Sequence, residues 1–265
     1  MKIAVTGEGP TDYGKEEYGT GKWLWGPIEV YLRRVAEQEG VSIELVPISR
    51  KDVENYRVQS RTLRGISGKG VPSRKFYCLF KKNECEYGIY YCDTDREKGT
   101  KNSSRLEAEK CWQEKYEEVK RGLDDPNCIP MIPLRMIENW ILGDQKAIET
   151  VYGFHSNNMK IPYDCEMLWG DKNDPESNYP QNYLTRFVRN LGKRYADQNL
   201  TMKDFREIAE SQDIETVQEH CKLSFSKFCA DYRRLLENSK NTGNARRYSE
   251  SKLKDLRTEI GLDVR

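Results

Sequence analysis

The sequence predicts an α/β protein with a central, mostly parallel sheet flanked by helices, followed by a helical C-terminal portion. Two observations predict this class. Short apolar runs of strand length alternate with helical segments over the first part of the chain, as they do in βαβ units. Further along, the strand-like runs thin out and amphipathic helical patterns follow one another. We therefore expect an α/β domain over residues 1–150, a helical extension over 151–240 and a polar tail over 241–265.

Four runs of apolar and β-branched residues, each bounded by turn residues, are expected as strands. They cover residues 2–6, 42–48, 87–92 and 128–134. Apolar residues at helical spacing, with Pro, Ser or Gly near the ends of the segments, predict the helices. These cover residues 27–36, 103–122, 136–144, 181–196, 201–210 and 214–238. Between the first strand and the first helix, residues 7–26 are expected as a glycine-rich loop.

Charge and composition narrow the classes of protein. Of the 265 residues, 37% are hydrophobic and 33% are charged, and 44 basic residues nearly cancel 43 acidic ones to a net charge of +1. Any nucleic-acid binding is therefore expected from a local basic patch. No apolar stretch approaches the roughly 20 residues of a membrane span, and the N-terminus does not have the pattern of a signal peptide. We expect a cytoplasmic protein with no membrane partner.

The cysteines do not indicate a metal or disulfide framework. Eight of them are scattered along the chain without a C-x2-C pair, and the chain has only two histidines. Zinc sites and disulfide-rich domains show closer and more regular spacing. We expect these thiols to be buried as small hydrophobic side chains.

Acidic side chains follow two of the expected strands. Glu8 lies in the glycine-rich segment after residues 2–6, and Asp93 and Asp95 follow residues 87–92. Ligands bind at the carboxyl ends of the strands in open α/β sheets, so these carboxylates are expected to converge if both strands are central. Hard oxygen ligands with room for water and phosphate suit Mg²⁺, or Mn²⁺ in its place. Such an ion polarises a phosphoryl oxygen and activates or orients a nucleophile.

Other interpretations of these motifs are open or weak. A D-x-D at the end of a strand is often only a polar turn. Nucleotide-sugar transferases also use D-x-D to bind their metal, so that interpretation stays open. The chain does not contain a Walker A loop, because Gly21-Lys22 is followed by Trp23 rather than by Ser or Thr. A haloacid-dehalogenase-type phosphotransferase requires D-x-D-x-T, and Glu97 stands at the threonine position.

A strongly basic segment spans residues 49–75, where eight Lys or Arg residues are interleaved with glycines. Charge runs usually form solvated loops, but beside an acidic metal site these residues would steer and hold phosphates. Lys69 is the first choice for a phosphate contact, because the glycines on either side of it let the backbone approach a phosphate closely. The candidate substrate-binding residues are Lys69, Arg61, Arg64, Lys75 and Arg96.

Aromatic and capping residues add three further expectations. Trp23 and Trp25, in the glycine-rich loop beside Glu8, are candidates for a substrate-side surface on which bases stack. Trp140 lies in an apolar helical stripe and is expected in the core. Asp12 is expected to cap the structure that follows it, because Asp is a preferred first residue of helices and turns.

The motif Glu8-Gly9-Pro10-Thr11-Asp12, with Asp93 and Asp95 after a later strand, resembles the Toprim (topoisomerase–primase) domain. Residues 136–144 (MIENWILGD) and 221–228 (CKLSFSKF) are similar to segments of a narrower group. That group consists of small bacterial Toprim-like proteins related to the nuclease domain of the overcoming-lysogenization-defect nucleases. The resemblance covers most of residues 1–236. The segment between Glu8 and Asp93 is long for a Toprim core, so residues 49–85 are expected as an insertion or a re-routed basic segment.

The resemblance implies a Toprim-like fold and metal-dependent hydrolysis of phosphodiester bonds in nucleic acid, often in bacterial anti-phage defence beside an ATPase partner. It implies that Glu8 is a general acid/base or a metal ligand, and that Asp93 and Asp95 hold Mg²⁺. Glu138 and Asp144 are too far apart in sequence to share one helix face. Glu138, just past the expected strand at 128–134, is therefore the better candidate for joining the site, and Asp144 is expected to cap or stop its helix.

Three hypotheses of function follow. The first is a Toprim-like, Mg²⁺-dependent nuclease. The second is a catalytically silent Toprim-like module that binds nucleic acid or an ATPase partner as a sensor, through residues 49–75. The third is a D-x-D metal-dependent glycosyltransferase. The substrate (DNA, RNA or a nucleotide) stays open, as does assembly into a homo-oligomer.

Overall fold

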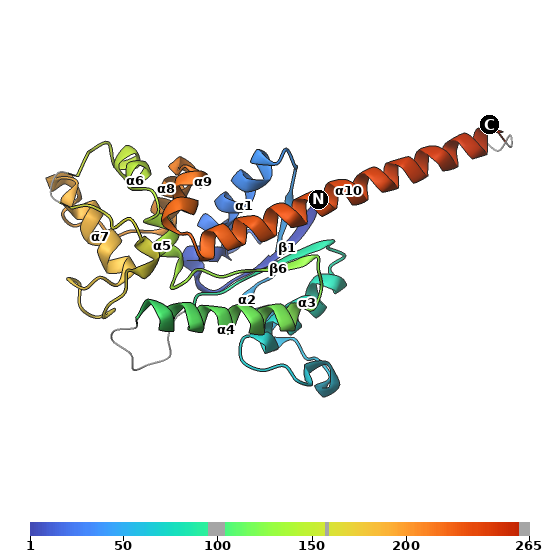
Figure 1. Ribbon diagram of the computed structural model, residues 1–265, viewed down its shortest axis with the longest axis horizontal. Coiled ribbons are helices and arrows are strands. Elements are labelled where there is room, and N and C mark those ends of the chain that lie inside the picture. Colours follow the sequence, from blue (N-terminus) through green and yellow to red (C-terminus); the bar gives the residue numbers. More distant parts are fainter. Residues whose placement is uncertain (95–103, 157–158, 260–265) are drawn as a thin grey trace.

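The protein is built around a four-stranded parallel sheet with the strand order β4-β1-β5-β6 (Figure 1). The computed structural model describes the backbone of residues 1–94, 104–156 and 159–259, and the side chains as far as residue 241. The strands of the sheet are β1 (Lys2–Thr6), β4 (Glu44–Pro47), β5 (Tyr87–Tyr91) and β6 (Cys128–Met131). The predicted α/β class is therefore confirmed, and all four expected strands are present.

The register of the sheet brings the carboxyl ends of three strands to one edge. Thr6 at the end of β1 lies opposite Tyr90 of β5, and Tyr91 lies opposite Met131 of β6. The connections from β1 lead to β4 on one side, and the chain then returns to add β5 on the other side. In open α/β sheets, this reversal of strand order opens a crevice at the carboxyl ends of the two strands concerned. That crevice lies between β1 and β5.

Alternation of side chains along the strands divides the core into two layers. Ile3, Val5 and Tyr91 point into the larger layer, and Ala4 and Tyr90 point into the smaller one. The larger layer contains α1 (Pro27–Gln38), α5 (Ile137–Ile141), α6 (Gln145–Tyr152), α7 (Pro180–Asn190), α8 (Met202–Ser211), α9 (Ile214–His220) and the first turns of α10 (Ser224–Glu259). The smaller layer contains α2 (Arg50–Asn55), α3 (Gly70–Lys82) and α4 (Arg105–Leu123). Figure 1 shows the sheet between α1 and α10 on one side and α3 and α4 on the other.

The two segments at 136–144 and 221–228 meet in the larger layer. Trp140 is fully buried, as expected, and its indole Nε1 donates a hydrogen bond to Ser224 Oγ at 2.8 Å. Its ring packs on Phe225 and Phe228, with ring centroids 5.0 and 5.7 Å apart. The buried carboxylate of Glu166 accepts hydrogen bonds from the first backbone N–H groups of α10, which a helix leaves without partners. These segments therefore join the C-terminal helices to the sheet.

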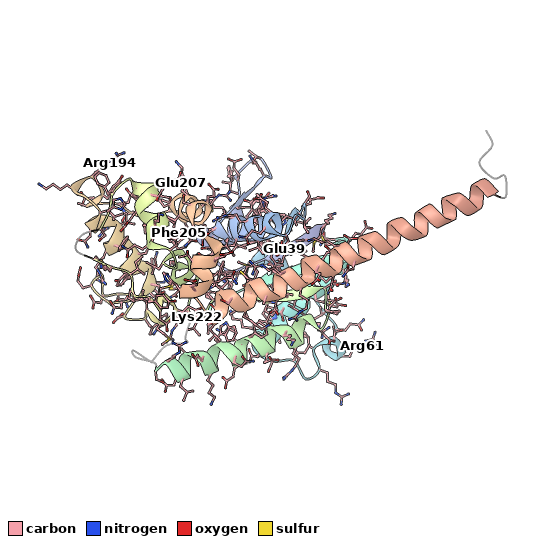
Figure 2. The ribbon with its side chains drawn as sticks, turned by 45° about the horizontal axis from the view of Figure 1, so that its top comes forward. Glu39, Arg61, Arg194, Phe205, Glu207 and Lys222 are labelled. Atoms are coloured by element: carbon pink, nitrogen blue, oxygen red, sulfur yellow. The ribbon has the colours of Figure 1, made fainter. Side chains whose placement is uncertain are left out.

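Beyond this core, α10 projects from the body of the molecule as a single long helix (Figures 1 and 2). Among the residues of α10 whose side chains the structure describes, up to residue 241, the last buried one is Leu236. The backbone then stays helical to Glu259. Within the described residues, no helix is both long enough and apolar enough to cross a membrane.

The structure corrects two expectations about secondary structure and shows how residues 49–85 are folded. The glycine-rich loop at 7–26 contains a π-helical turn (Gly9–Tyr13) and an antiparallel hairpin of β2 (Gly14–Glu16) and β3 (Trp23–Trp25). The predicted helix at 214–238 is two helices, because the chain turns between α9 and α10 to reach Glu166. Residues 49–85 form the connection from β4 to β5, with α2, α3 and the short helix Ser60–Leu63 between them. Two further short helices are Cys165–Met167 and Lys193–Tyr195.

Candidate functional site

Glu8 follows β1 and lies at the carboxyl edge of the sheet. Its Oε1 atom accepts a hydrogen bond from the Lys69 ammonium in an ion pair whose side chains are 23% and 31% exposed, respectively. Burial by itself lowers the pKa of Lys69, but the hydrogen bond and the charge of Glu8 outweigh it, so the pKa is raised. Lys69 is therefore a charged partner of Glu8 at neutral pH. Two of the predicted site residues, 61 positions apart in sequence, thus meet.

The glycines that flank Lys69 serve a different purpose from the one expected. The Lys69 backbone N–H donates to the Glu118 carboxylate of α4 at 2.9 Å. A Cβ atom at Gly68 would lie 2.2 Å from that carboxylate, and a Cβ atom at Gly70 would lie 2.7 Å from the Glu118 carbonyl oxygen. The glycines therefore let this segment approach α4, and the expectation that they bring backbone to a phosphate is wrong. The Lys69 side chain remains directed at the site.

A small pocket of about 190 Å³ opens beside the ion pair. Arg50 lines it from α2 and pairs with Glu54 at 2.6 Å, and this hydrogen bond raises the pKa of the Arg50 guanidinium. Each cation of the pocket thus has an anion beside it. The lining residues are Thr6, Gly7, Glu8, Arg50, Val53, Glu54, Lys69, Pro72, Tyr90 and Tyr91. This pocket occupies the carboxyl end of β1 and β5, where the strand order predicts a ligand.

Asp93 follows β5 and is held from several directions. Its Oδ1 atom accepts a hydrogen bond from the Tyr91 hydroxyl, and its backbone carbonyl accepts one from Lys115 Nζ of α4 at 3.3 Å. The next residue, Thr94, is tied to the loop after β6 through the Arg135 carbonyl at 3.0 Å. Asp93 is only 8% exposed. The aspartate at the end of β5 is therefore an ordered, buried carboxylate rather than part of a mobile polar turn.

Asp12 belongs to the same group of carboxylates. We predict that it caps the structure that follows it, but it lies inside the π-helical turn Gly9–Tyr13, and its Oδ2 atom accepts a hydrogen bond from Tyr91 at 3.4 Å. The backbone of Asp12 packs closely on Gly26, because a Cβ atom at Gly26 would lie only 2.0 Å from the Asp12 carbonyl oxygen. The cap prediction is wrong, because the turn closes on itself and directs the side chain inward.

Glu138 and Asp144 separate as expected. Glu138 lies in the first turn of α5, just after β6, and is 5% exposed. Its charge acts on the Tyr91 hydroxyl, together with the charges of Asp93 and Asp12. Asp144 caps α6, where it accepts from the Ala147 backbone N–H at 3.1 Å. Glu138 therefore follows β6 as predicted, whereas Asp144 caps the next helix, α6, rather than the helix predicted at 136–144.

The Cys92 thiol is buried in the smaller core layer. Burial raises its pKa, and the charge of Glu8 raises it further. The ammonium groups of Lys69 and Lys115 act on the same thiol in the opposite direction. The Glu8–Lys69 pair and Asp93 both lie at the carboxyl edge of the sheet, after β1 and after β5.

Three other predicted residues, Arg61, Arg64 and Lys75, do not line this pocket. Arg61 and Arg64 are exposed on the connection between α2 and α3, and Figure 2 shows Arg61 at the periphery of the molecule. Lys75 donates to the Glu54 backbone carbonyl at 2.7 Å. Asp95 and Arg96 lie outside the residues that the structure describes.

Trp23 and Trp25 are partly buried and pack against the loop that carries Glu8. Their ring centroids are 4.9 and 5.6 Å from the ring of Tyr13. The Tyr13 hydroxyl donates to the Val5 carbonyl at 2.7 Å and so ties this aromatic group to β1. Each indole therefore packs in part against Tyr13 and stabilises the loop that carries Glu8.

The donor atoms of this region suit a hard divalent cation, because carboxylate oxygens are the ligands that Mg²⁺ prefers. Glu8, Asp12, Asp93 and Glu138 supply them from three neighbouring strand ends. Within residues 1–94, 104–156 and 159–241, no three His, Cys, Asp or Glu side chains are already arranged to hold a metal ion. In this arrangement Glu8 is paired with Lys69, and Asp93 is hydrogen-bonded to Tyr91.

Four residues of this region escaped the sequence interpretation: Asp12, Arg50, Tyr91 and Lys115. Tyr91 and Lys115 sit within segments whose apolar or helical pattern was recognised, and the pattern carries no sign of what the polar atoms touch. Asp12 did offer a signal, since an acidic residue six positions after β1 falls at the same edge as Glu8.

Residues 51–232 match the model of a protein family described as a domain of unknown function (DUF4276). Because this match covers more than half of the chain, the protein belongs to that family. The matched region contains Lys69, Asp93, Lys115 and Glu138, and it begins after Glu8 and Asp12. No curated protein and no solved structure matches the chain.

Proposed function

We propose that the protein is a Toprim-like, Mg²⁺-dependent nuclease that hydrolyses phosphodiester bonds of nucleic acid. One observation supports this most: acidic side chains follow three adjacent parallel strands, β1, β5 and β6, at one edge of the sheet. Lys69 and Lys115 lie at the same edge. Phosphodiester hydrolysis needs two functions. Carboxylates bind a divalent cation, and ammonium groups beside them bind the phosphate.

The roles of the individual residues follow from their positions. Asp93 and Glu8, with Asp95, would hold the ion, which supplies polarisation of a phosphoryl oxygen. Lys69 would turn from Glu8 to a non-bridging phosphate oxygen and neutralise its charge. In hydrolysis, the oxygen of water bonds to phosphorus, the phosphorus–oxygen bond to one sugar breaks, and that sugar oxygen receives a proton. A carboxylate at the edge, Glu8 or Glu138, would take the proton from the attacking water.

The resemblance of the sequence adds the biological setting to this proposal. It supports a role in bacterial anti-phage defence together with an ATPase partner. The projecting α10 and the exposed basic connection with Arg61 and Arg64 are surfaces on which such a partner or nucleic acid could rest.

A cleavage assay tests the proposal. The purified protein is incubated with single- and double-stranded DNA and RNA in Mg²⁺, Mn²⁺ or a chelator, and products are resolved by length. We expect cleavage only with the divalent ions, and a loss of about a hundredfold in Glu8→Gln, which removes a catalytic carboxylate. Glu44→Gln is the matched control, because Glu44 is exposed at the opposite end of the sheet. Equal rates for Glu8→Gln and wild type would contradict the proposal.

A silent nucleic-acid-binding module is the second candidate function, and the ion pairs of the pocket favour it. Glu8 with Lys69 and Arg50 with Glu54 satisfy each other without any ligand. This candidate predicts binding that survives in the chelator, with no cleavage under any divalent ion. Replacing Arg61, Arg64 and Lys69 together should then weaken binding and flatten its dependence on salt concentration.

Lys69→Gln separates the two roles that the proposal gives to Lys69. The variant is expected to bind nucleic acid about tenfold more weakly, with a salt dependence reduced by about one phosphate contact. Its apparent affinity for Mn²⁺ should not fall, because Glu8 loses the cation that competes with the metal. Fluorescence anisotropy and a calorimetric titration measure the two quantities. Lys82→Gln, which changes an exposed lysine at the end of α3, the helix that follows Lys69, should leave both unchanged. Weaker Mn²⁺ binding in Lys69→Gln would rule out this competition.

A further inference from the structure

The Tyr91 hydroxyl occupies an unusual position at the last residue of β5. Its ring is fully buried in the larger core layer, and β5 is paired on both sides, with β1 and with β6. A phenol in such a place costs free energy unless its hydroxyl is hydrogen-bonded, and phenylalanine would fill the same space without that cost. The presence of a hydroxyl therefore calls for an explanation beyond packing.

The partners of the hydroxyl are carboxylates. It donates to Asp93 Oδ1 and lies 3.4 Å from Asp12 Oδ2, so a single phenolic proton faces two acidic side chains. Tyr91 and Asp93 are two positions apart on an extended chain, which places their side chains on the same face. Core packing holds the ring in place. The hydroxyl is therefore fixed, and its hydrogen bond orients the Asp93 carboxylate.

The surrounding backbone is built closely around this arrangement. A Cβ atom at Gly7 would lie 2.7 Å from Tyr13 Cβ and 3.1 Å from Tyr91 Cδ1, so the loop after β1 rests directly on the ring. Gly9 has φ +77°, and a Cβ there would lie 3.0 Å from Asp12 Oδ2. The glycines of the Gly7-Glu8-Gly9 stretch thus permit the contact between Asp12 and Tyr91.

We infer that Tyr91 is a positioning residue of the site: its buried hydroxyl holds the Asp93 carboxylate, against Asp12, in the orientation that a divalent cation requires. This inference rests on the proposed function and deepens it. Binding groups must be held within about 0.5 Å of their working geometry, and the hydrogen-bonded neighbours of a ligand provide that control. Lys115 and Thr94 hold the backbone at Asp93, and Tyr91 holds its side chain.

Tyr91→Phe tests the inference, because it keeps the ring and removes only the hydroxyl. The readout is the melting temperature of the protein as Mn²⁺ is added, which rises as the metal stabilises the folded state. We expect the concentration of Mn²⁺ that gives half of this rise to be about tenfold higher in Tyr91→Phe than in wild type. In the cleavage assay, kcat at low Mn²⁺ should fall, KM for nucleic acid should stay unchanged, and high Mn²⁺ should restore kcat.

Tyr232→Phe is the matched control. Its ring is also fully buried, and within the described residues its hydroxyl has no hydrogen-bond partner, so its removal should leave the Mn²⁺ response unchanged. An unaltered half-saturating Mn²⁺ concentration in Tyr91→Phe, whatever its metal-free melting temperature, would overturn the role of Tyr91 and leave the proposed function standing. A wild-type protein whose melting temperature does not respond to Mn²⁺ or Mg²⁺ would overturn the metal site and, with it, the inference.

Discussion

Asp93→Asn is expected to reduce Mg²⁺-dependent cleavage by about a thousandfold, the largest effect on activity among single substitutions at this edge. A bound cation stabilises the charge of the transition state by several kcal/mol, and about 4 kcal/mol corresponds to a thousandfold in rate. Asparagine lacks the negative charge that holds the cation. Its amide oxygen can still accept the hydrogen bond from Tyr91, so the end of β5 should keep its structure. The cleavage rate at saturating nucleic acid, over a titration of Mg²⁺, measures the effect.

The outcome is informative only if the fold of the variant is intact. Circular dichroism and the metal-free melting temperature of Asp93→Asn provide that check. Asp197→Asn, which changes an exposed aspartate in the C-terminal half, serves as the matched control and should cleave like wild type. Wild-type cleavage by a folded Asp93→Asn protein would show that any nuclease activity arises at another place in the molecule.

Trp140→Ala is expected to lower the free energy of unfolding by about 3–5 kcal/mol, because it removes the largest fully buried side chain of the core. The substitution leaves a cavity among Tyr31, Phe225 and Phe228, whose rings all pack on the indole. It also removes the donor to Ser224 Oγ. Since the same short helix carries Glu138, loosening it should disturb the site as well. Chemical denaturation followed by circular dichroism measures the change.

Tyr18→Ala is the control for this stability prediction. Among the described residues, Tyr18 is the most exposed large hydrophobic side chain, and it lies between β2 and β3, so its removal should leave the free energy of unfolding essentially unchanged. If Trp140→Ala unfolded at the same denaturant concentration as wild type, the two segments at 136–144 and 221–228 would not form the link between the sheet and the C-terminal helices.

The strands were predictable because their signal is local. Residues 87–91 are apolar throughout, as a strand buried on both faces must be, and the run ends at a polar turn. Helix α4 was predictable for a similar reason, since Ser104 caps it and forms a reciprocal capping box with Glu107. Where a short stretch of chain carries both its pattern and its end signals, the structure follows the prediction.

The elements that were wrong depend on distant contacts. The strands Gly14–Glu16 and Trp23–Trp25 are only three residues long, and they gain their stability from packing on Tyr13 rather than from their own pattern. The break between α9 and α10 depends on Glu166, which lies more than 50 residues earlier and draws the chain at Leu223 out of a continuous helix. A local sequence pattern cannot indicate either of these contacts.

The residues of the candidate site also differ in whether their positions follow from local patterns or from distant contacts. Glu8 and Asp93 were predictable, because each follows an apolar strand and parallel strands end at a common edge. The ion pair of Glu8 with Lys69 was not, since it depends on how the connection from β4 returns across the sheet. The role of Tyr91 was not predictable either. A tyrosine in an apolar run has the pattern of an ordinary core residue, and only the structure shows which groups its hydroxyl contacts.

We propose that the carboxyl edge of β1 and β5 binds a divalent cation at Asp93. Anomalous X-ray diffraction from crystals of the protein soaked in Mn²⁺ tests it most directly, because the signal locates the ion without reference to activity. The account predicts an anomalous peak within coordinating distance of an Asp93 carboxylate oxygen, and no peak at that place in crystals of Asp93→Asn. A Mn²⁺ peak only at other positions, or none at this edge of the sheet, would contradict it.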